Sequence, residues 1–266
     1  MKLAVDIGGS TFRYATGNRN NHKTHDIPSY DGTQSYDELI QQLIALTKET
    51  SPQTMHVAAP GPIYPPGIIS PSDAPSPNIP WSDKPIQHDL NDQLDIPVYV
   101  QRDLFCAAEG LVTETDSETF TLIYPGTGFG YATVIDGHVV TGTNNVAGEL
   151  AQQQANNQTY DDRLSLSQLQ RLDDENRSPK TILKRPVTQP LTDYLQQLSS
   201  HVAPLINVVA TPNVFIGGHL AEHWQSVKPQ LEQGITERLP YDPSIQPTNE
   251  TPLRGAFILG ERQLHF

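Results

Sequence analysis

Two short glycine-rich turns, each set between runs of apolar residues, constrain the fold of this chain more than any other feature of its sequence. The first turn is Asp6-Ile7-Gly8-Gly9-Ser10 and the second is Pro125-Gly126-Thr127-Gly128-Phe129-Gly130. The runs that flank them are Leu3–Val5, Phe12–Ala15, Phe120–Tyr124 and Tyr131–Ile135. Short apolar runs bounded by glycine are typical of β-strands, so each turn predicts a β-hairpin. Two such hairpins in one chain predict two related halves that face a shared cleft.

Both turns have the chemistry of a phosphate-binding loop. Glycine has no Cβ, so backbone N–H groups can approach phosphate oxygens closely, and a neighbouring hydroxyl adds a donor. Ser10 and Thr127 supply these hydroxyls, and the Asp6 carboxylate could hold a metal ion beside the same phosphates. The structural alternatives are that Asp6 closes a turn and that the two hydroxyls are ordinary turn residues. The pattern indicates phosphoryl transfer, although neither turn alone is specific.

The composition excludes several classes of protein. The net charge of −13 argues against nucleic acid or an anionic membrane as a partner, because either would be repelled. No apolar stretch reaches the length of about 18 residues that a transmembrane helix needs. The segment Met1–Asp6 turns acidic too early for a signal peptide, so a cytoplasmic protein is expected. Cys106 is the only cysteine, which excludes an intrachain disulfide and a multi-cysteine zinc site.

The remaining pattern predicts an α/β protein of two domains. A capping box of Ser35 and Glu38 opens a helix to Thr50, and Trp81 is expected to anchor the long loop that follows Pro60. Other expected helices lie at residues 104–111, 165–172, 192–209, 253–259 and from about 220, and other strands at residues 55–59, 96–101 and 214–216. The polar stretch 152–162 is expected to be mobile. The predicted domains are residues 1–110 with the C-terminal helix 252–266, and residues 111–251.

Seven short motifs follow one another along the chain. They are Asp6-Ile7-Gly8-Gly9-Ser10, Ala59-Pro60-Gly61-Pro62, Pro77-Asn78-Ile79-Pro80-Trp81, Arg102-Asp103, Gly126-Thr127-Gly128-Phe129-Gly130, Gly148-Glu149-Leu150 and Ile216-Gly217-Gly218-His219. In this order they resemble the motifs of the ROK family of sugar kinases, which includes glucokinase-like enzymes. Each motif alone is weak, but the seven together span nearly the whole chain.

The resemblance implies two actin-like ATPase (ribonuclease H-like) domains flanking a cleft. It also implies ATP-dependent phosphorylation of a hydroxyl of a hexose or amino-hexose, with domain closure that excludes water and Asp103 as general base. The sugar ligands that it implies are Asn78, Asp103, Glu149 and Gln152. The expected ATP and Mg²⁺ site comprises Asp6 as the metal ligand with Gly8, Gly9, Ser10, Thr11, Gly126, Thr127, Gly128, Gly217 and Gly218. A homodimer is expected because relatives are commonly dimers.

Several of these residues could instead have a purely structural role. A carboxylate that opens a helix, as Asp103 does, is also an ordinary helix cap. Asn78 lies between prolines and could be a turn residue, while Gly217 and Gly218 could serve packing. Cys106, one turn after Asp103, is expected to be a small buried apolar residue.

The chain also departs from the family pattern. In the family a Gly-Glu-x-Gly-His motif supplies a zinc-ligating histidine, whereas this chain has Gln152 at that position and no later cysteine, so the structural zinc is expected to be absent. Arg102 replaces an asparagine and removes an expected sugar contact. Thr11 stands where many relatives have lysine or asparagine, and Arg13 is a candidate to compensate. A later sugar-binding glutamate has no clear counterpart in the stretch 160–172.

Three other functions compete with the kinase at the level of the sequence. A catalytically inactive sugar or nucleotide sensor would explain Gln152 and Arg102, whereas the intact Asp6, Asp103 and glycine turns favour an enzyme. The segment His219-Leu220-Ala221-Glu222-His223 matches the inverted zinc-peptidase pattern, but no third ligand is evident downstream. A transcriptional repressor is not expected, because the first glycine turn begins at residue 6 and precludes a DNA-binding extension before it.

Overall fold

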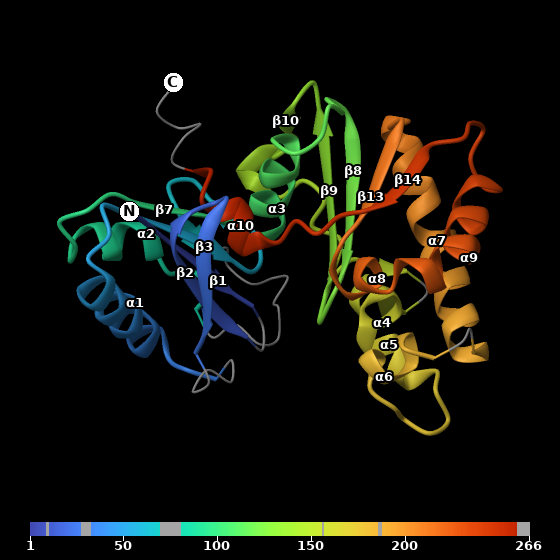
Figure 1. The fold of residues 1–266 in the computed structure, drawn as a ribbon, viewed down its shortest axis with the longest axis horizontal. Helices are drawn as coiled ribbons and strands as arrows, with labels where there is room; N and C mark the ends of the chain where they lie inside the picture. The colour runs from blue at the N-terminus through green and yellow to red at the C-terminus, as the bar shows by residue number, and fades with distance from the viewer. Residues whose placement is uncertain (9–10, 28–32, 70–80, 156, 186–187, 260–266) are drawn as a thin grey trace. The chain divides into compact units, whose positions relative to one another are not determined.

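The chain folds into two compact units, shown in Figure 1. The structure is a computed structural model that describes all residues except 9–10, 28–32, 70–80, 156, 186–187 and 260–266. Unit 1 comprises residues 1–114, 139–147 and 250–266, and unit 2 comprises residues 115–138 and 148–249. The segment 139–147, which the sequence analysis assigned to the second domain, therefore belongs to unit 1.

Unit 1 is built on a five-stranded mixed sheet. The order of its strands is β3 (Asn21–Asp26), β2 (Phe12–Asn18), β1 (Lys2–Ile7), β4 (Thr54–Ala59) and β7 (Val98–Arg102). The first three strands are antiparallel, whereas β4 and β7 run parallel to β1. The predicted hairpin around the first glycine turn is thus confirmed as β1 and β2. A short hairpin of β5 (Ile63–Tyr64) and β6 (Ile68–Ile69) lies in the loop after β4.

Helices cover both faces of this sheet. Leu3, Val5 and Ile7 of β1 point to the face covered by α1 (Tyr36–Thr50) and α2 (Ile86–Asn91), because side chains alternate along a strand. Ala4 points to the other face, which α3 (Asp103–Val112) and α10 (Pro252–Ala256) cover (Figure 1). These two helices pack closely: a Cβ added to Gly255 of α10 would lie 1.8 Å from the Cys106 carbonyl oxygen of α3.

Two predicted anchors of unit 1 are confirmed. The Ser35 hydroxyl accepts a hydrogen bond from the Glu38 N–H at 3.3 Å, and the Glu38 carboxylate accepts from the Ser35 N–H at 2.8 Å. This is the capping box that opens α1. Trp81 is fully buried, and its indole N–H donates to the Gln34 carbonyl at 2.8 Å.

A buried ion cluster joins the end of α3 to the segment that leads into α10. Glu250, whose side chain is fully buried, accepts a hydrogen bond from Arg19 at 2.5 Å, and Arg19 also donates to the Gly110 carbonyl at 2.7 Å. Arg254 pairs with Glu114 and lies 3.6 Å from Glu250. Glu114 and Glu250 are the unit 1 residues at two of the points where the chain crosses between the units. The cluster therefore ties these two crossing points together within unit 1.

Unit 2 repeats the strand plan of unit 1. Its sheet has the order β10 (His138–Val139), β9 (Phe129–Ile135), β8 (Phe120–Pro125), β13 (Asn213–Ile216) and β14 (Ser244–Pro247). β8 and β9 form the predicted second hairpin, while β13 and β14 run parallel to β8. In both sheets a hairpin supplies the first strands and two parallel strands follow, which confirms the expectation of two related halves.

The core of unit 2 lies between the sheet and its longest helices. These are α7 (Gln189–Val209) and α9 (Trp224–Thr236), whose apolar faces pack with β8, β9 and β13. The smaller helices are α4 (Tyr160–Leu164), α5 (Leu166–Arg171), α6 (Pro179–Leu183) and α8 (Gly218–Glu222), and a 3₁₀ turn η1 (Thr143–Asn145) belongs to unit 1. In the described part of the chain, no helix combines the length and the apolar character needed to cross a membrane.

The stretch 152–162, which the sequence predicts to be mobile, contains secondary structure on both sides of residue 156. It forms a small hairpin of β11 (Gln154–Ala155) and β12 (Gln158–Thr159) and the start of α4. Its backbone hydrogen bonds include Tyr160 N–H to the Gln153 carbonyl at 3.1 Å and Asp161 N–H to the Ala151 carbonyl at 2.9 Å. These bonds need no apolar side chains, so a polar composition does not prevent them.

Candidate active site

Three parallel strands of unit 1 end at the same edge of the sheet and bring three of the motifs together. In the register of the sheet, Asp6 of β1 is opposite Ala58 of β4, and Ala59 of β4 is opposite Arg102 of β7. The first glycine turn, the Pro60-Gly61 turn and Asp103 therefore leave the sheet side by side. The carboxyl ends of parallel strands are where open α/β sheets place their ligands.

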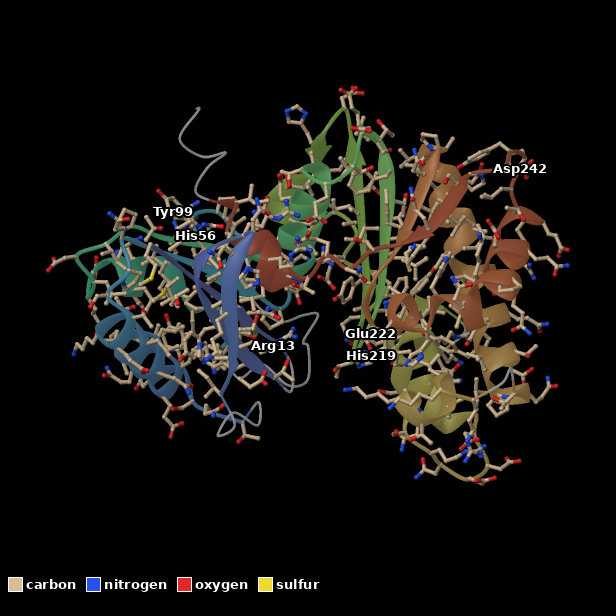
Figure 2. All side chains as sticks on the ribbon, in the orientation of Figure 1. Arg13, His56, Tyr99, His219, Glu222 and Asp242 are labelled. Atoms are coloured by element: carbon tan, nitrogen blue, oxygen red, sulfur yellow. The ribbon has the colours of Figure 1, made fainter. Side chains whose placement is uncertain are left out.

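Asp6 lies at this edge in an ion pair with Arg13. The Arg13 guanidinium, whose residue is labelled in Figure 2, donates to the Asp6 carboxylate at 2.6 Å from the opposite position on β2. Burial raises the pKa of Asp6, and the charge and hydrogen bond of Arg13 oppose that rise without cancelling it. Arg13, the candidate to compensate for Thr11, is thus directed to the Asp6 carboxylate.

The first glycine turn is closed by a backbone hydrogen bond from Gly8 N–H to the Thr11 carbonyl at 2.7 Å. A Cβ on Gly8 would lie 2.9 Å from the Thr11 hydroxyl oxygen, so the turn leaves little room for a larger residue. Thr11 itself is exposed. Gly9 and Ser10 lie outside the described residues, so their contribution to phosphate binding stays a prediction.

Asp103 is the first residue of α3. Its carboxylate accepts a hydrogen bond from the Leu104 N–H at 2.6 Å, and Asp103 is only partly buried. Burial raises the pKa of the Cys106 thiol well above its usual range, and the charges of Asp103, Asp6 and Glu109 add to the rise. Cys106 is buried, as expected from the sequence. Asp6 near the end of β1 and Asp103 directly after β7 lie at the same edge of the sheet, with β4 between the two strands.

Arg102 has a structural role beside Asp103. It is buried, its guanidinium donates to the Ala147 carbonyl at 2.9 Å, and it lies over the Phe105 ring at 5.0 Å from the centroid. Asn145 donates to the Ile63 carbonyl at 2.8 Å. These contacts hold the segment 139–147 against β7 and β5 of unit 1, near the proposed base. Asn78, the other predicted sugar ligand of this unit, lies outside the described residues.

The second glycine turn, residues 126–128, is held at both ends. Gly126 N–H donates to the Gly128 carbonyl at 2.8 Å, and the Gly126 carbonyl accepts from Leu166 N–H at 2.9 Å. Thr127 and Gly128 are exposed. The turn therefore presents its hydroxyl and one glycine to solvent from a fixed backbone, as a phosphate loop requires.

Gly217 and Gly218 follow the neighbouring parallel strand, β13. Gly217 N–H donates to the Ile123 carbonyl of β8 at 2.9 Å, and a Cβ on Gly217 would lie 2.2 Å from a ring carbon of Tyr124. Gly218 has a φ of +65°, which favours glycine. Packing against Tyr124 is thus enough to explain why residue 217 is glycine. Contact with a nucleotide stays a prediction for both glycines.

Unit 2 also contains a carboxylate that the sequence analysis missed, Asp161. It accepts hydrogen bonds from Phe129 N–H at 2.6 Å and from the Gln152 amide at 3.2 Å. Burial raises the pKa of Asp161, the Phe129 bond lowers it, and the charges of Glu149 and Asp162 raise it further. The structure thus brings Gln152 and Asp161 together at the second glycine turn, and Glu149 lies three residues before Gln152 in the chain.

A sequence signal for Asp161 did exist. Thr159 and Asp162 form a capping box, with the Thr159 hydroxyl accepting from Asp162 N–H at 3.0 Å. This box starts α4 and puts Asp161 in its first turn. Asp161 lies within the stretch in which the resemblance implies a later acidic sugar ligand.

The zinc-peptidase pattern forms only a pair. The His219 ring nitrogen lies 3.0 Å from the Glu222 carboxylate near the surface of α8 (Figure 2). Across the ranges that the structure describes, no three His, Cys, Asp or Glu side chains are grouped as a metal site would need. The geometry at this position therefore gives no support to the peptidase interpretation.

Comparisons with known proteins agree with this arrangement. An N-acetyl-D-glucosamine kinase of Histophilus somni is 29% identical over 162 residues, which cover 59% of this chain and 53% of that protein. An uncharacterised protein of Clostridium perfringens is 26% identical over 180 residues, which cover 62% of this chain and 58% of that protein. The chain thus matches these curated relatives over little more than half of their length.

The fold has a counterpart in solved structures. A ROK family glucokinase from Streptomyces griseus, solved with glucose and AMPPNP, superposes with a TM-score of 0.78 at 16% identity, over 98% of this chain and 99% of that one. This likeness shows an actin-like ATPase fold in mixed α/β architecture. The sequence profile of the ROK family matches residues 2–262. With a match over nearly its whole length and the family's fold in both units, this chain belongs to the ROK family.

Proposed function

We propose that this chain is an ATP-dependent sugar kinase that phosphorylates a hydroxyl of a hexose or amino-hexose. The observation that carries the proposal is the placement of Asp6 and Asp103 at the carboxyl ends of β1 and β7, beside the first glycine turn. One strand, β4, separates β1 from β7 in the sheet. Phosphoryl transfer depends on positioning and charge neutralisation, and these groups suit both tasks.

Asp103 would act as the general base. The sugar hydroxyl gives its proton to the Asp103 carboxylate as its oxygen attacks the γ-phosphorus of ATP, and ADP leaves. The hydrogen bond from Leu104 N–H holds the carboxylate in one orientation. Asp103 is the first residue of α3 and the N-cap position is Arg102, so this hydrogen bond is local to the first turn and leaves a catalytic role open to Asp103.

The donor set at Asp6 fits magnesium. Mg²⁺ is usually held by one or two carboxylates together with substrate phosphates, and Asp6 offers one carboxylate next to the glycine turn, with one of its oxygens bound by Arg13. Mg²⁺ bound there would neutralise charge on the transferred phosphoryl group. The chain does not fit a structural zinc, because Gln152 is no zinc ligand and the one cysteine, Cys106, is buried in unit 1.

The sugar would be held by Glu149 and Gln152 together with Asn78. Vicinal hydroxyls need paired donors and acceptors, and an unpaired buried group costs about 1–3 kcal/mol. The substrate class is suggested by the relatives named as N-acetyl-D-glucosamine kinase and glucokinase, and the nucleotide by the AMPPNP in the glucokinase structure. Use of ATP also fits the cytoplasmic location expected from the sequence.

A sensor without catalysis is the second candidate. It is favoured by two observations: Arg102 is engaged with the Ala147 carbonyl, and the Gln152 amide is engaged with Asp161. A ROK family transcriptional regulator has the same fold, with a TM-score of 0.77 at 17% identity over 99% of this chain and 78% of that one. The fold therefore accommodates both classes, and catalysis must be measured.

A coupled ADP-release assay with Mg-ATP and a panel of sugars tests the proposal. Suitable sugars are glucose, N-acetylglucosamine, N-acetylmannosamine, mannose and fructose. We expect sugar-dependent turnover that falls about 10²–10⁴-fold in Asp103→Asn, because the asparagine oxygen can still accept from Leu104 N–H but cannot take a proton. Full turnover in this variant would disprove the role of Asp103. No turnover with any sugar, while a sugar or ATP still raises the melting temperature, would establish the sensor.

A further inference from the structure

We infer that Asp161 is a positioning residue that holds the second glycine turn and links it to the sugar-binding residues Glu149 and Gln152. Through this link, occupancy of the sugar site would change the affinity of the turn for nucleotide. The inference rests on the proposed kinase function for the identity of the two ligands. Its structural basis lies entirely within unit 2.

The first half of the link joins Asp161 to the turn. One carboxylate oxygen accepts from Phe129 N–H at 2.6 Å, the backbone group that directly follows Gly128. A Cβ on Gly128 would lie 3.3 Å from the same oxygen, so the carboxylate lies against the turn itself. The Gly126 carbonyl is bound by Leu166 N–H, five residues after Asp161 along the chain. The segment that carries Asp161 therefore forms hydrogen bonds at both ends of the turn.

The second half of the link joins Asp161 to the proposed sugar ligands. The other carboxylate oxygen accepts from the Gln152 amide at 3.2 Å, and the charge of Glu149 contributes to the raised pKa of Asp161. The Asp161 N–H also donates to the Ala151 carbonyl at 2.9 Å, which fixes the backbone next to Gln152. One side chain thus contacts both the turn and the residue proposed to contact a sugar hydroxyl.

The chemistry of this position calls for a carboxylate. An ionised carboxylate accepts hydrogen bonds at both oxygens, so it can bind Phe129 N–H and the Gln152 amide at once. An asparagine has one carbonyl oxygen and one NH₂ group, and the NH₂ group cannot accept from a second donor. Asp161→Asn therefore keeps the volume of the side chain and breaks one half of the link.

The coupling follows from the shared side chain. A sugar that engages the Gln152 amide or the Glu149 carboxylate changes what Asp161 is bound to, and so changes how firmly Asp161 holds Phe129 N–H. Two sites that bias one element are energetically coupled, and the coupling is reciprocal. Typical couplings change an affinity by about 5–150-fold, so we expect sugar to tighten nucleotide binding by at least about fivefold.

Calorimetry on the full chain tests the inference. The Kd of AMPPNP with Mg²⁺ is measured with and without the sugar that the activity panel or, failing that, thermal stabilisation identifies. In the unmodified chain we expect sugar to lower this Kd about fivefold or more, and in Asp161→Asn by less than about twofold. Hydrogen exchange of the Phe129 amide gives a second readout, and we expect it to be faster in the variant.

Asp162→Asn is the matched control. Asp162 is the neighbouring carboxylate, but it binds Thr159 and lies 3.6 Å from Arg171 rather than contacting the turn. We expect this variant to keep the sugar-dependent gain. If Asp161→Asn fails to fold, Gln152→Leu removes the amide that Asp161 accepts from. Because Gln152 is also a proposed sugar ligand, this variant is measured at a sugar concentration that saturates it, where the gain should be lost while Phe129 exchange stays slow.

The outcomes separate this inference from the kinase proposal. A gain that is equal in Asp161→Asn and Asp162→Asn, or absent from the unmodified chain, would overturn the link. Because binding and exchange do not need turnover, the link can hold in a chain that shows no kinase activity. Conversely, turnover in a chain whose ligands bind independently would support the kinase and refute the link.

Discussion

Gly110→Ala is expected to destabilise the protein, although alanine is the better helix former. Gly110 lies in α3, and a Cβ at this position would be 2.4 Å from a Glu250 carboxylate oxygen and 2.6 Å from its carboxyl carbon. The Glu250 side chain is fully buried and bound by Arg19 at 2.5 Å. Because these distances are far inside van der Waals contact, the carboxylate must move away from its partner.

The size of the effect follows from the two opposing contributions. Breaking a buried ion pair costs about 3–5 kcal/mol, whereas replacing a helical glycine by alanine recovers about 1 kcal/mol. We expect a net loss of about 2–4 kcal/mol in the free energy of unfolding. At roughly 2–4 °C for each kcal/mol in a chain of this size, the melting temperature should fall by about 4–16 °C.

A double-mutant cycle measured by calorimetry isolates the cause. Glu250→Ala removes the side chain that the new methyl group would strike. In that background Gly110→Ala should become neutral or should stabilise by up to about 1 kcal/mol. An equal cost in both backgrounds would refute the reasoning, because the clash with Glu250 would then contribute nothing. Stabilisation by Gly110→Ala in the unmodified chain would refute it as well.

Three further predictions concern the capping box, a buried carboxylate and a close contact. Ser35→Ala should lower the free energy of urea unfolding by about 1 kcal/mol, since Glu38 N–H loses its acceptor; no change would mean that α1 does not need its cap. Burial raises the pKa of Glu250 above its ordinary 4.5, so the folded chain binds that proton more tightly and stability falls as pH rises through the folded pKa. Urea titrations should show a smaller fall in Glu250→Gln, and an identical pH profile would contradict this. Gly217→Ala should lower the melting temperature, because its Cβ would lie 2.2 Å from the Tyr124 ring, and Tyr124→Ala should suppress that loss.

The parts of the fold that the sequence predicted are those with strong local signals. The β1–β2 and β8–β9 hairpins follow from glycine between apolar runs, and α1 follows from its capping box and apolar face. Trp81 was recognised as an anchor because a large aromatic side chain in a proline-rich loop needs a buried place. In each case a few neighbouring residues carry the information.

The features that were missed depend on contacts between distant residues. β3 and β14 have few apolar residues, and their pairing partners, β2 and β13, define them as strands. The segment 139–147 belongs to unit 1 through contacts such as Arg102 to the Ala147 carbonyl, which no local pattern reveals. The same holds for Asp161, because its hydrogen bonds are to Phe129 and Gln152, which are distant from it in the chain.

The division of unit 1 into separate segments has a consequence for synthesis. The face of its sheet that carries Ala4, Ala15 and Ala58 is covered by α3 and by Leu253 and Phe257, and the ribosome adds the last two after all of unit 2. Unit 2 lies between residues 115 and 249, so it can be completed while the part of that face under Leu253 and Phe257 is still open to water. A nascent chain halted just before α10 would therefore carry one finished unit and one unfinished unit whose apolar face is available to chaperones.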